Sequence, residues 1–135
     1  MIQNLFGKSS ILEKSLNATW LRNDVIAQNI ANDDTPMYKR KDVAFEDVLN
    51  ASVNKLEAKV TNKRHIPFNT SNIDNVQPQI TESNSDVSMR IDGNNVDIDN
   101  EMASLAKNTI KYNTLVQLIN GSYSKIKNVI SEGRR

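Results

Sequence analysis

The chain has 135 residues with 17 Lys or Arg and 16 Asp or Glu, so its formal net charge is only +1. This length corresponds to one compact domain, and the balanced charge argues against a nucleic-acid partner, which a strongly basic surface would favour. Cysteine is absent, which excludes disulfides, thiol nucleophiles and thiolate metal sites. Hydrophobic residues make up 38% and aromatic residues 5%, so we expect a small private core and a stability that depends on partners.

The N-terminal residues 1–10 have neither the basic start nor the continuous apolar stretch of a secretory signal peptide. No later stretch approaches the roughly eighteen apolar residues that a transmembrane helix needs. We therefore expect no membrane span. If the protein leaves the cytoplasm, we expect a route that uses no cleavable signal.

The first predicted helix covers residues 10–32, because apolar residues recur there at helical spacing and neither Pro nor Gly interrupts them. Ser9 or Ser10 is its candidate N-cap. A heptad grid places one apolar stripe on Leu12, Leu16, Ile26 and Ile30, and a second stripe on Ile11, Ala18, Leu21 and Val25. The polar wedge between the stripes consists of Glu13, Asn17, Asp24 and Gln28. A helix that is apolar on two sides needs neighbours on both of them.

The middle segment 33–96 is polar and rich in Asn, Ser, Thr and Asp, so we predict a small irregular region. One short helix is predicted after Asp42, with a signal that fades near Lys59. Its apolar residues are Phe45, Val48, Leu49, Val53 and Leu56. The pair Asp92-Gly93 predicts a turn, which would close a small β-hairpin between residues 87–91 and 96–98.

The strongest helical pattern runs from about Asn100 to Ile130, and Asp97 and Asp99 supply an N-cap and negative charge at its start. Its apolar residues alternate three and four apart, which indicates a gentle left-handed supercoil against another helix. These residues are Met102, Leu105, Tyr112, Val116, Ile119, Tyr123, Ile126 and Ile130, with Thr109 as a polar interruption. Gly121 inside this helix costs roughly 1 kcal/mol relative to Ala and permits a bend.

Together the patterns predict a mainly α-helical protein whose long N- and C-terminal helices pair antiparallel as a coiled-coil-like bundle. Residues 1–32 and 97–135 would form a discontinuous helical assembly domain, and residues 33–96 a separate polar segment. The two helices could also close on each other as a simple intramolecular core. The two-sided first helix favours packing between subunits instead, because subunit contacts would cover the second apolar stripe.

Candidate chemistry is sparse. His65 is the single histidine, and it lies in a predicted loop without a second histidine or a serine-centred nucleophile motif beside it. The acidic residues near the second long helix are Asp92, Asp97, Asp99 and Glu101. They do not fit an EF-hand loop, because Gly93 follows the first aspartate directly. We therefore predict no catalytic residue, metal site, cofactor or small-molecule substrate, and no enzymatic activity.

Two segments resemble a known family. Residues 25–40, Val-Ile-Ala-Gln-Asn-Ile-Ala-Asn-Asp-Asp-Thr-Pro-Met-Tyr-Lys-Arg, resemble the signature of flagellar rod and hook proteins, in which Asn-Ile-Ala-Asn runs into Thr-Pro-Gly-Tyr. Residues 90–102, Arg-Ile-Asp-Gly-Asn-Asn-Val-Asp-Ile-Asp-Asn-Glu-Met, resemble the proximal-rod family in particular. The matching positions are Asn29, Ile30, Ala31, Asn32, Thr35, Pro36, Tyr38, Asp92, Gly93, Asn94, Asp97 and Glu101. Met37 departs from the family's usual glycine, so we expect a type I turn or another local geometry there.

The resemblance implies a structural subunit in the proximal rod of the bacterial flagellar basal body, which transmits torque and encloses the export channel. It also implies export by the flagellar type III apparatus without a cleaved signal. The implied partners are other copies of the chain, neighbouring rod proteins, the protein that joins the membrane ring to the rod, and the export apparatus. The residues leave one alternative open, a cytoplasmic coiled-coil adaptor or chaperone whose heptads bind a client helix.

Overall fold

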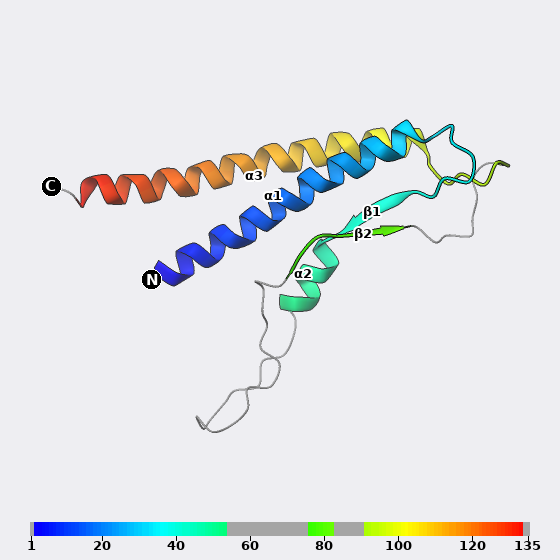
Figure 1. Cartoon of the computed structure of the whole chain (residues 1–135). Helices are drawn as coiled ribbons and strands as arrows, with labels where there is room; N and C mark the ends of the chain where they lie inside the picture. Colours follow the sequence, from blue (N-terminus) through cyan, green and yellow to red (C-terminus); the bar gives the residue numbers. More distant parts are fainter. Residues whose placement is uncertain (1, 54–75, 83–90, 134–135) are drawn as a thin grey trace, which may run out of the picture.

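The computed structural model describes residues 2–53, 76–82 and 91–133, and the fold is mainly helical. In chain order the elements are α1 (Ile2–Ala31), β1 (Lys41–Ala44), α2 (Glu46–Val53), β2 (Gln79–Glu82) and α3 (Ile98–Glu132). The two long helices lie side by side, and the small elements gather beneath α1 (Figure 1). The predicted long terminal helices and short middle helix are therefore present.

The helices α1 and α3 run in opposite directions. Hydrogen bonds join Asn29 to Glu101, Thr19 to Asn108 and Glu13 to Tyr123. Residues further along α3 therefore contact residues nearer the start of α1. The two chain ends lie at the same end of the molecule, where the helices diverge (Figure 1). The helices are thus held together most closely at the end where the middle segment joins them.

The helix starts differ from the sequence prediction at α1 and agree with it at α3. The helix α1 already begins at Ile2, so the prediction that Ser9 or Ser10 caps it is wrong. A glycine inside a helix lowers its stability without ending it, and Gly7 lies within the first turns of α1. At α3 the predicted N-cap is confirmed, because an oxygen of Asp97 accepts bonds from the backbone N–H groups of Asp99 and Asn100 at 3.0 and 3.4 Å.

A small hydrophobic core lies between α1 and the middle segment. Its buried members are Ala18, Val25, Val43, Phe45 and Val76, with Leu21, Val48 and Leu49 packed against them. The second apolar stripe of α1 therefore faces β1 and α2, while other positions of α1 meet α3. This explains why α1 carries apolar residues on two sides.

The middle segment does contain an antiparallel strand pair, although between other residues than predicted. β1 pairs with β2, from Lys41 opposite Glu82 to Ala44 opposite Gln79. The predicted strand at 96–98 is wrong, because Asp97 caps α3 and Ile98 begins it. Its predicted partner lies mostly outside the described residues, as do His65 and the extension of α2 toward Lys59. The predicted turn at Asp92-Gly93 is confirmed, with Gly93 at φ +82°.

Candidate assembly site at the helix junction

The centre of the junction is a pair of fully buried polar side chains, Asn29 of α1 and Glu101 of α3. Asn29 Nδ2 donates to Glu101 Oε2 at 3.1 Å and to the Lys41 carbonyl at 2.8 Å, and Asn29 Oδ1 accepts from the Lys41 N–H at 3.0 Å. An amide side chain offers both donors and an acceptor, so it can imitate a neighbouring strand. Asn29 thereby fixes the end of α1, the start of β1 and the start of α3 at one point.

The buried carboxylate of Glu101 has a cationic partner. Arg40 Nε donates to Glu101 Oε1 at 2.6 Å, while the Tyr38 hydroxyl donates to Asn29 Oδ1 at 3.3 Å. A buried charge is tolerated when it is paired and hydrogen-bonded, and it becomes strongly destabilising when one partner is removed. Burial, together with the nearby charges of Glu82 and Glu101, raises the pKa of Tyr38. The junction therefore holds Glu101 in place through two elements of the chain.

Asn94 closes the end of α1. Buried backbone carbonyls outside a helix need donors from elsewhere, and in the turn directly after α1 Asn94 Nδ2 lies 2.8 to 3.0 Å from the carbonyl oxygens of Asn32, Asp33 and Thr35. Its own Oδ1 accepts from the Val96 N–H at 2.8 Å. Asn94 is fully buried, so this single amide ties the segment before α3 to the exit of α1.

The tight turn after α1 keeps a positive φ although the residue there is methionine. The Tyr38 N–H donates to the Thr35 carbonyl at 3.3 Å, and Met37 between them has φ +61°, the sign that a type II turn requires at this position. The expected change to a type I turn is therefore wrong. The Met37 N–H donates to the Asp92 carbonyl at 3.1 Å, which holds this backbone. A Cβ on Gly93 would lie 2.7 Å from Met37 Sδ, so glycine fits there.

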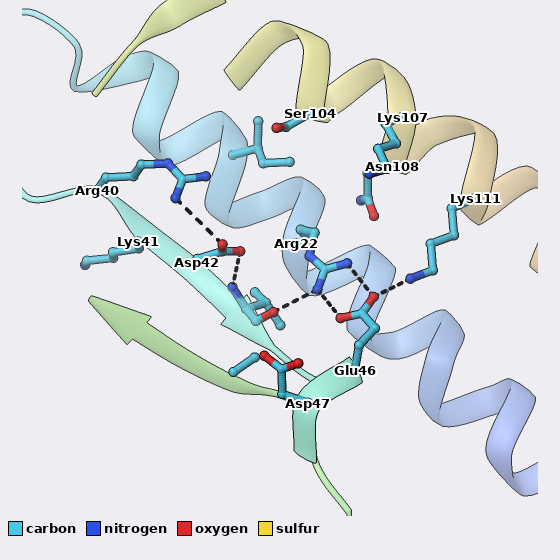
Figure 2. Close-up of a pocket in the computed structure, with 13 residues that line it drawn as sticks. Arg22, Arg40, Lys41, Asp42, Glu46, Asp47, Ser104, Lys107, Asn108 and Lys111 are labelled. Carbon is cyan, nitrogen blue, oxygen red and sulfur yellow. Dashed lines mark hydrogen bonds and ion pairs between the residues drawn. The ribbon is translucent and has the colours of Figure 1, made fainter. Parts of the chain in front are cut away.

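A second cluster links α1, α2 and α3 through charge (Figure 2). Arg22 Nη1 and Nη2 donate to the two oxygens of Glu46 at 2.8 and 2.5 Å, and Nη2 also donates to the Val43 carbonyl at 2.8 Å. Lys111 of α3 forms an ion pair with the same carboxylate. The hydrogen bonds between Glu46 and Arg22 hold the pKa of Glu46 well below its ordinary value, and the hydrogen bond from Lys111 lowers it further. We call these three residues the Glu46 clamp.

The Glu46 clamp borders a pocket of about 480 Å³ between β1, α1 and α3 (Figure 2). Its wall includes Asn108, which is 3% exposed and donates from Nδ2 to the Thr19 carbonyl and to Asn23 Oδ1, both at 2.8 Å. Among the described residues, no group of three or more acidic or histidine side chains is placed to hold a metal ion. In the described part of the chain, no helix combines the length and apolar character needed to cross a membrane.

The predicted seam residues divide into two groups. In α1, Ile26 is buried and Leu12, Leu16 and Ile30 are half-buried. In α3, Leu105, Tyr112, Val116, Ile119 and Ile126 are half-buried, whereas Met102, Tyr123 and Ile130 stay 50% to 67% exposed. Within one chain, five seam residues of α3 are thus partly covered and three stay exposed. We call the three exposed residues the open part of the seam. The role of the seam in assembly stays a prediction.

Sequence reasoning missed five residues of the site: Arg22, Arg40, Glu46, Asn108 and Lys111. Each contacts a residue at least 21 positions away, so neither helical nor strand periodicity relates the partners. The family motif did mark the junction residues Asn29, Asn94 and Glu101. The motif therefore located the junction, although it did not reveal what each side chain contacts.

These features define a class of protein, a helical subunit whose two terminal helices are locked together by a polar junction and leave apolar surface open to other chains. No protein-family model matches the sequence. It is 39% identical over 123 residues to the flagellar basal body rod protein FlgB of Bacillus subtilis, covering 91% of this chain and 92% of that protein. It is 30% identical over 146 residues to FlgB of Yersinia enterocolitica and 29% over 127 residues to FlgB of Aquifex aeolicus, covering 98% and 94% of this chain and 100% and 95% of those proteins. The chain belongs to the FlgB family of flagellar basal body rod proteins.

Proposed function

We propose that this chain is a structural subunit of the proximal rod of the flagellar basal body and that it assembles through its terminal helices. The observation that carries the proposal is the match to FlgB proteins of several bacteria over nearly the full length of both chains. In this role the subunit transmits torque, helps enclose the export channel and performs no catalysis. The relatives give no support to a cytoplasmic adaptor or chaperone.

The junction suits a mechanical role. Directional, buried hydrogen bonds fix the angle at which the two long helices leave the middle segment. These bonds are made by Asn29, Glu101, Arg40 and Asn94. With 35 residues, α3 is a rod about 50 Å long. A stiff helix pair anchored at one end transmits force to whatever packs along its length.

The open part of the seam provides the surface for assembly in this proposal. Met102 is 53% exposed, Tyr123 50% and Ile130 67%, and apolar area of this kind gains about 25 cal/mol for each Å² that a partner covers. Residues 1–32 and 97–135 would act together as the assembly domain, with 33–96 as an attached segment. The partners in this proposal are other copies of the chain, neighbouring rod proteins, the protein joining the membrane ring to the rod, and the export apparatus that delivers the chain without a cleavable signal.

Isolation of intact basal bodies from cells that produce a tagged copy tests the proposal. We expect mass spectrometry to find the tagged chain in the rod fraction at a level comparable with other rod proteins. Deletion of the gene should abolish swimming, and the tagged copy should restore it. Recovery of the chain exclusively in the cytoplasm, bound to soluble proteins, would instead support an adaptor.

A further inference from the structure

One exposed stripe runs along α1 and has the spacing of a second helix-packing seam. From Ser9 onward, the exposed residues of α1 are Glu13, Asn17, Trp20, Asp24, Ala27, Gln28 and Ala31. Without Gln28 they lie alternately four and three residues apart, which is the spacing that one helix presents to another. None of them is basic, and Trp20 is 64% exposed. We call this set the Trp20 stripe.

A second exposed stripe runs along α3 with the same alternation of four and three. Its residues are Lys107, Lys111, Thr114, Leu118, Gly121 and Lys125. None of them is acidic, and Leu118 is 54% exposed. We call this set the Leu118 stripe. From Thr114 onward it lies apart from the side of α3 that meets α1 in the same chain, where Glu101, Asn108 and Tyr123 make their contacts. Lys107 and Lys111 instead border the pocket of the same chain, and Lys111 pairs with Glu46.

Gly121 in the Leu118 stripe meets no side chain in the described part of the chain that would require a residue this small. A Cβ placed on it would meet no atom within 4 Å, so no neighbour in the described part of the chain requires a glycine there. Glycine in the middle of a helix is destabilising relative to alanine. Close approach of a bulky side chain from outside the chain is a physical reason to keep this position small.

We propose that the Trp20 stripe of one copy packs antiparallel against the Leu118 stripe of a second copy. The matching spacings set Trp20 beside Leu118 and Gly121, and Glu13 opposite Lys125. Within its own chain Glu13 also accepts a hydrogen bond from the Tyr123 hydroxyl. This inference rests on the proposed function and specifies which surfaces of two copies meet. Glu13 and Lys125 carry opposite charges, which favours this pairing over stripes of like charge, and an aromatic side chain occupies the space above a glycine.

The two stripes lie on different helices, so the contact is heterologous. Each copy would offer its Trp20 stripe to one neighbour and its Leu118 stripe to another. Contacts of this type produce a ring or an open helical polymer rather than a closed dimer. The geometry is therefore that of a subunit in an axial structure.

Disulfide trapping tests this pairing, because the chain contains no cysteine. Cells would produce two versions with tags of different size, one carrying Trp20→Cys and the other Leu118→Cys, and their isolated basal bodies would be oxidised. We expect a mixed disulfide dimer containing both tags. Ile110→Cys in place of Leu118→Cys is the control, because Ile110 is also exposed but lies about 12 Å nearer the N-terminal end of α3. This control should give at least fivefold less mixed dimer.

The outcomes separate this inference from the proposed function. Both chains in the basal bodies without a mixed dimer, or with equal amounts for Leu118→Cys and Ile110→Cys, would overturn the pairing and leave the rod assignment intact. Absence of both chains and of the tagged unmodified copy from basal bodies would overturn the rod assignment and the pairing with it.

A second variant covers the case in which Trp20→Cys blocks incorporation. We expect Gly121→Leu to reduce swimming strongly while the helix content of the purified chain, followed by circular dichroism, does not fall. The charge reversal Lys125→Glu should reduce swimming, and Glu13→Lys in the same chain should restore it in part. Normal swimming with Gly121→Leu, or no rescue of Lys125→Glu, would count against the pairing.

Discussion

The two ends of the α1–α3 pair are built on opposite principles. At the junction, polar side chains such as Asn29, Asn94 and Glu101 are fully buried and hydrogen-bonded. Toward the termini, apolar side chains such as Val129 and Ile130 are 71% and 67% exposed, and the helices diverge (Figure 1). The junction sets geometry within one chain, because directional hydrogen bonds allow few alternative arrangements. The open end leaves its apolar surface uncovered, and in the proposed function partners cover it.

The largest effect on the single chain should come from the junction. Glu101→Ala leaves Arg40 and Asn29 without their common partner, and a buried hydrogen-bonding group left without a partner typically costs about 1 to 3 kcal/mol. The larger cost of an unpaired buried charge does not apply, because Arg40 is 32% exposed and also pairs with Asp42. We expect a loss of this size in the free energy of unfolding, measured by urea denaturation with circular dichroism. Glu132→Ala, an exposed position of α3, is the control and should change it by less than about 0.5 kcal/mol. Equal losses would show that the junction is not the more stable end.

In the half-buried part of the α3 seam the large effect should appear in assembly. Val116→Asp or Ile119→Asp places a charge on the seam, where a partner would have to desolvate it. We expect loss of rod incorporation and swimming while secretion of the chain continues, measured on soft agar and in the culture medium. Asn113→Asp is an exposed control and should be nearly neutral. Lys111 is a poorer control because it pairs with Glu46. Swimming cells with the seam aspartates would contradict the assignment of this face.

An intermediate effect should follow acidification, because the Glu46 clamp is electrostatic. The pKa of Glu46 is lowered in the folded chain, so the clamp contributes stability above the unfolded value of 4.5 and loses it as pH falls toward the folded value. Glu46 is 43% exposed, so the contribution is about 1 kcal/mol after solvent screening. We expect Glu46→Gln to reduce the slope of unfolding free energy against pH below about 4.5. Asp47→Asn is the neighbouring control, and an equal change there would contradict the clamp.

The smallest effect should be a gain at the turn. Met37 holds φ +61°, and a left-handed conformation costs an L-residue about 1 to 2 kcal/mol. Met37→Gly removes this strain but adds freedom to the unfolded chain, so we expect a net stabilisation of about 0.5 to 1 kcal/mol in thermal unfolding. Met37→Ala keeps the Cβ and should give no gain. A similar gain in both variants would mean that removal of the methionine side chain, and not the backbone strain, is responsible.

Sequence patterns predicted the elements whose residues interact over short distances. The heptads of α3 and the N-cap at Asp97 gave a long helix with nearly correct bounds, because helix formation and capping depend on neighbours within four residues. The sequence patterns did not predict the first strand, β1. β1 is four residues long and contains one buried side chain, Val43, so it carries no visible alternation. Its partner β2 is exposed throughout, so it shows no alternation of buried and exposed residues either.

The polar contacts between elements could not be predicted from the chain alone. A buried Asn108 in the middle of an apolar heptad pattern looks like an ordinary surface residue of α3. The structure places it against the Thr19 carbonyl of α1, because α1 approaches α3 one residue away from the predicted seam, next to Asn108 rather than Thr109. Where apolar residues occupy neighbouring positions, the sequence alone does not decide which of them faces the partner helix.

The bonds that join α1 to α3 also impose an order on folding. Asn29 and Glu101 are 72 residues apart, Thr19 and Asn108 are 89 apart, and Glu13 and Tyr123 are 110 apart. Closing such long loops costs conformational entropy before any contact forms, and distant contacts slow folding. In a chain made from its N-terminus, Asn29 is present long before its partner Glu101 is added. The last quarter of the polypeptide must therefore be present before α1 and α3 can be joined.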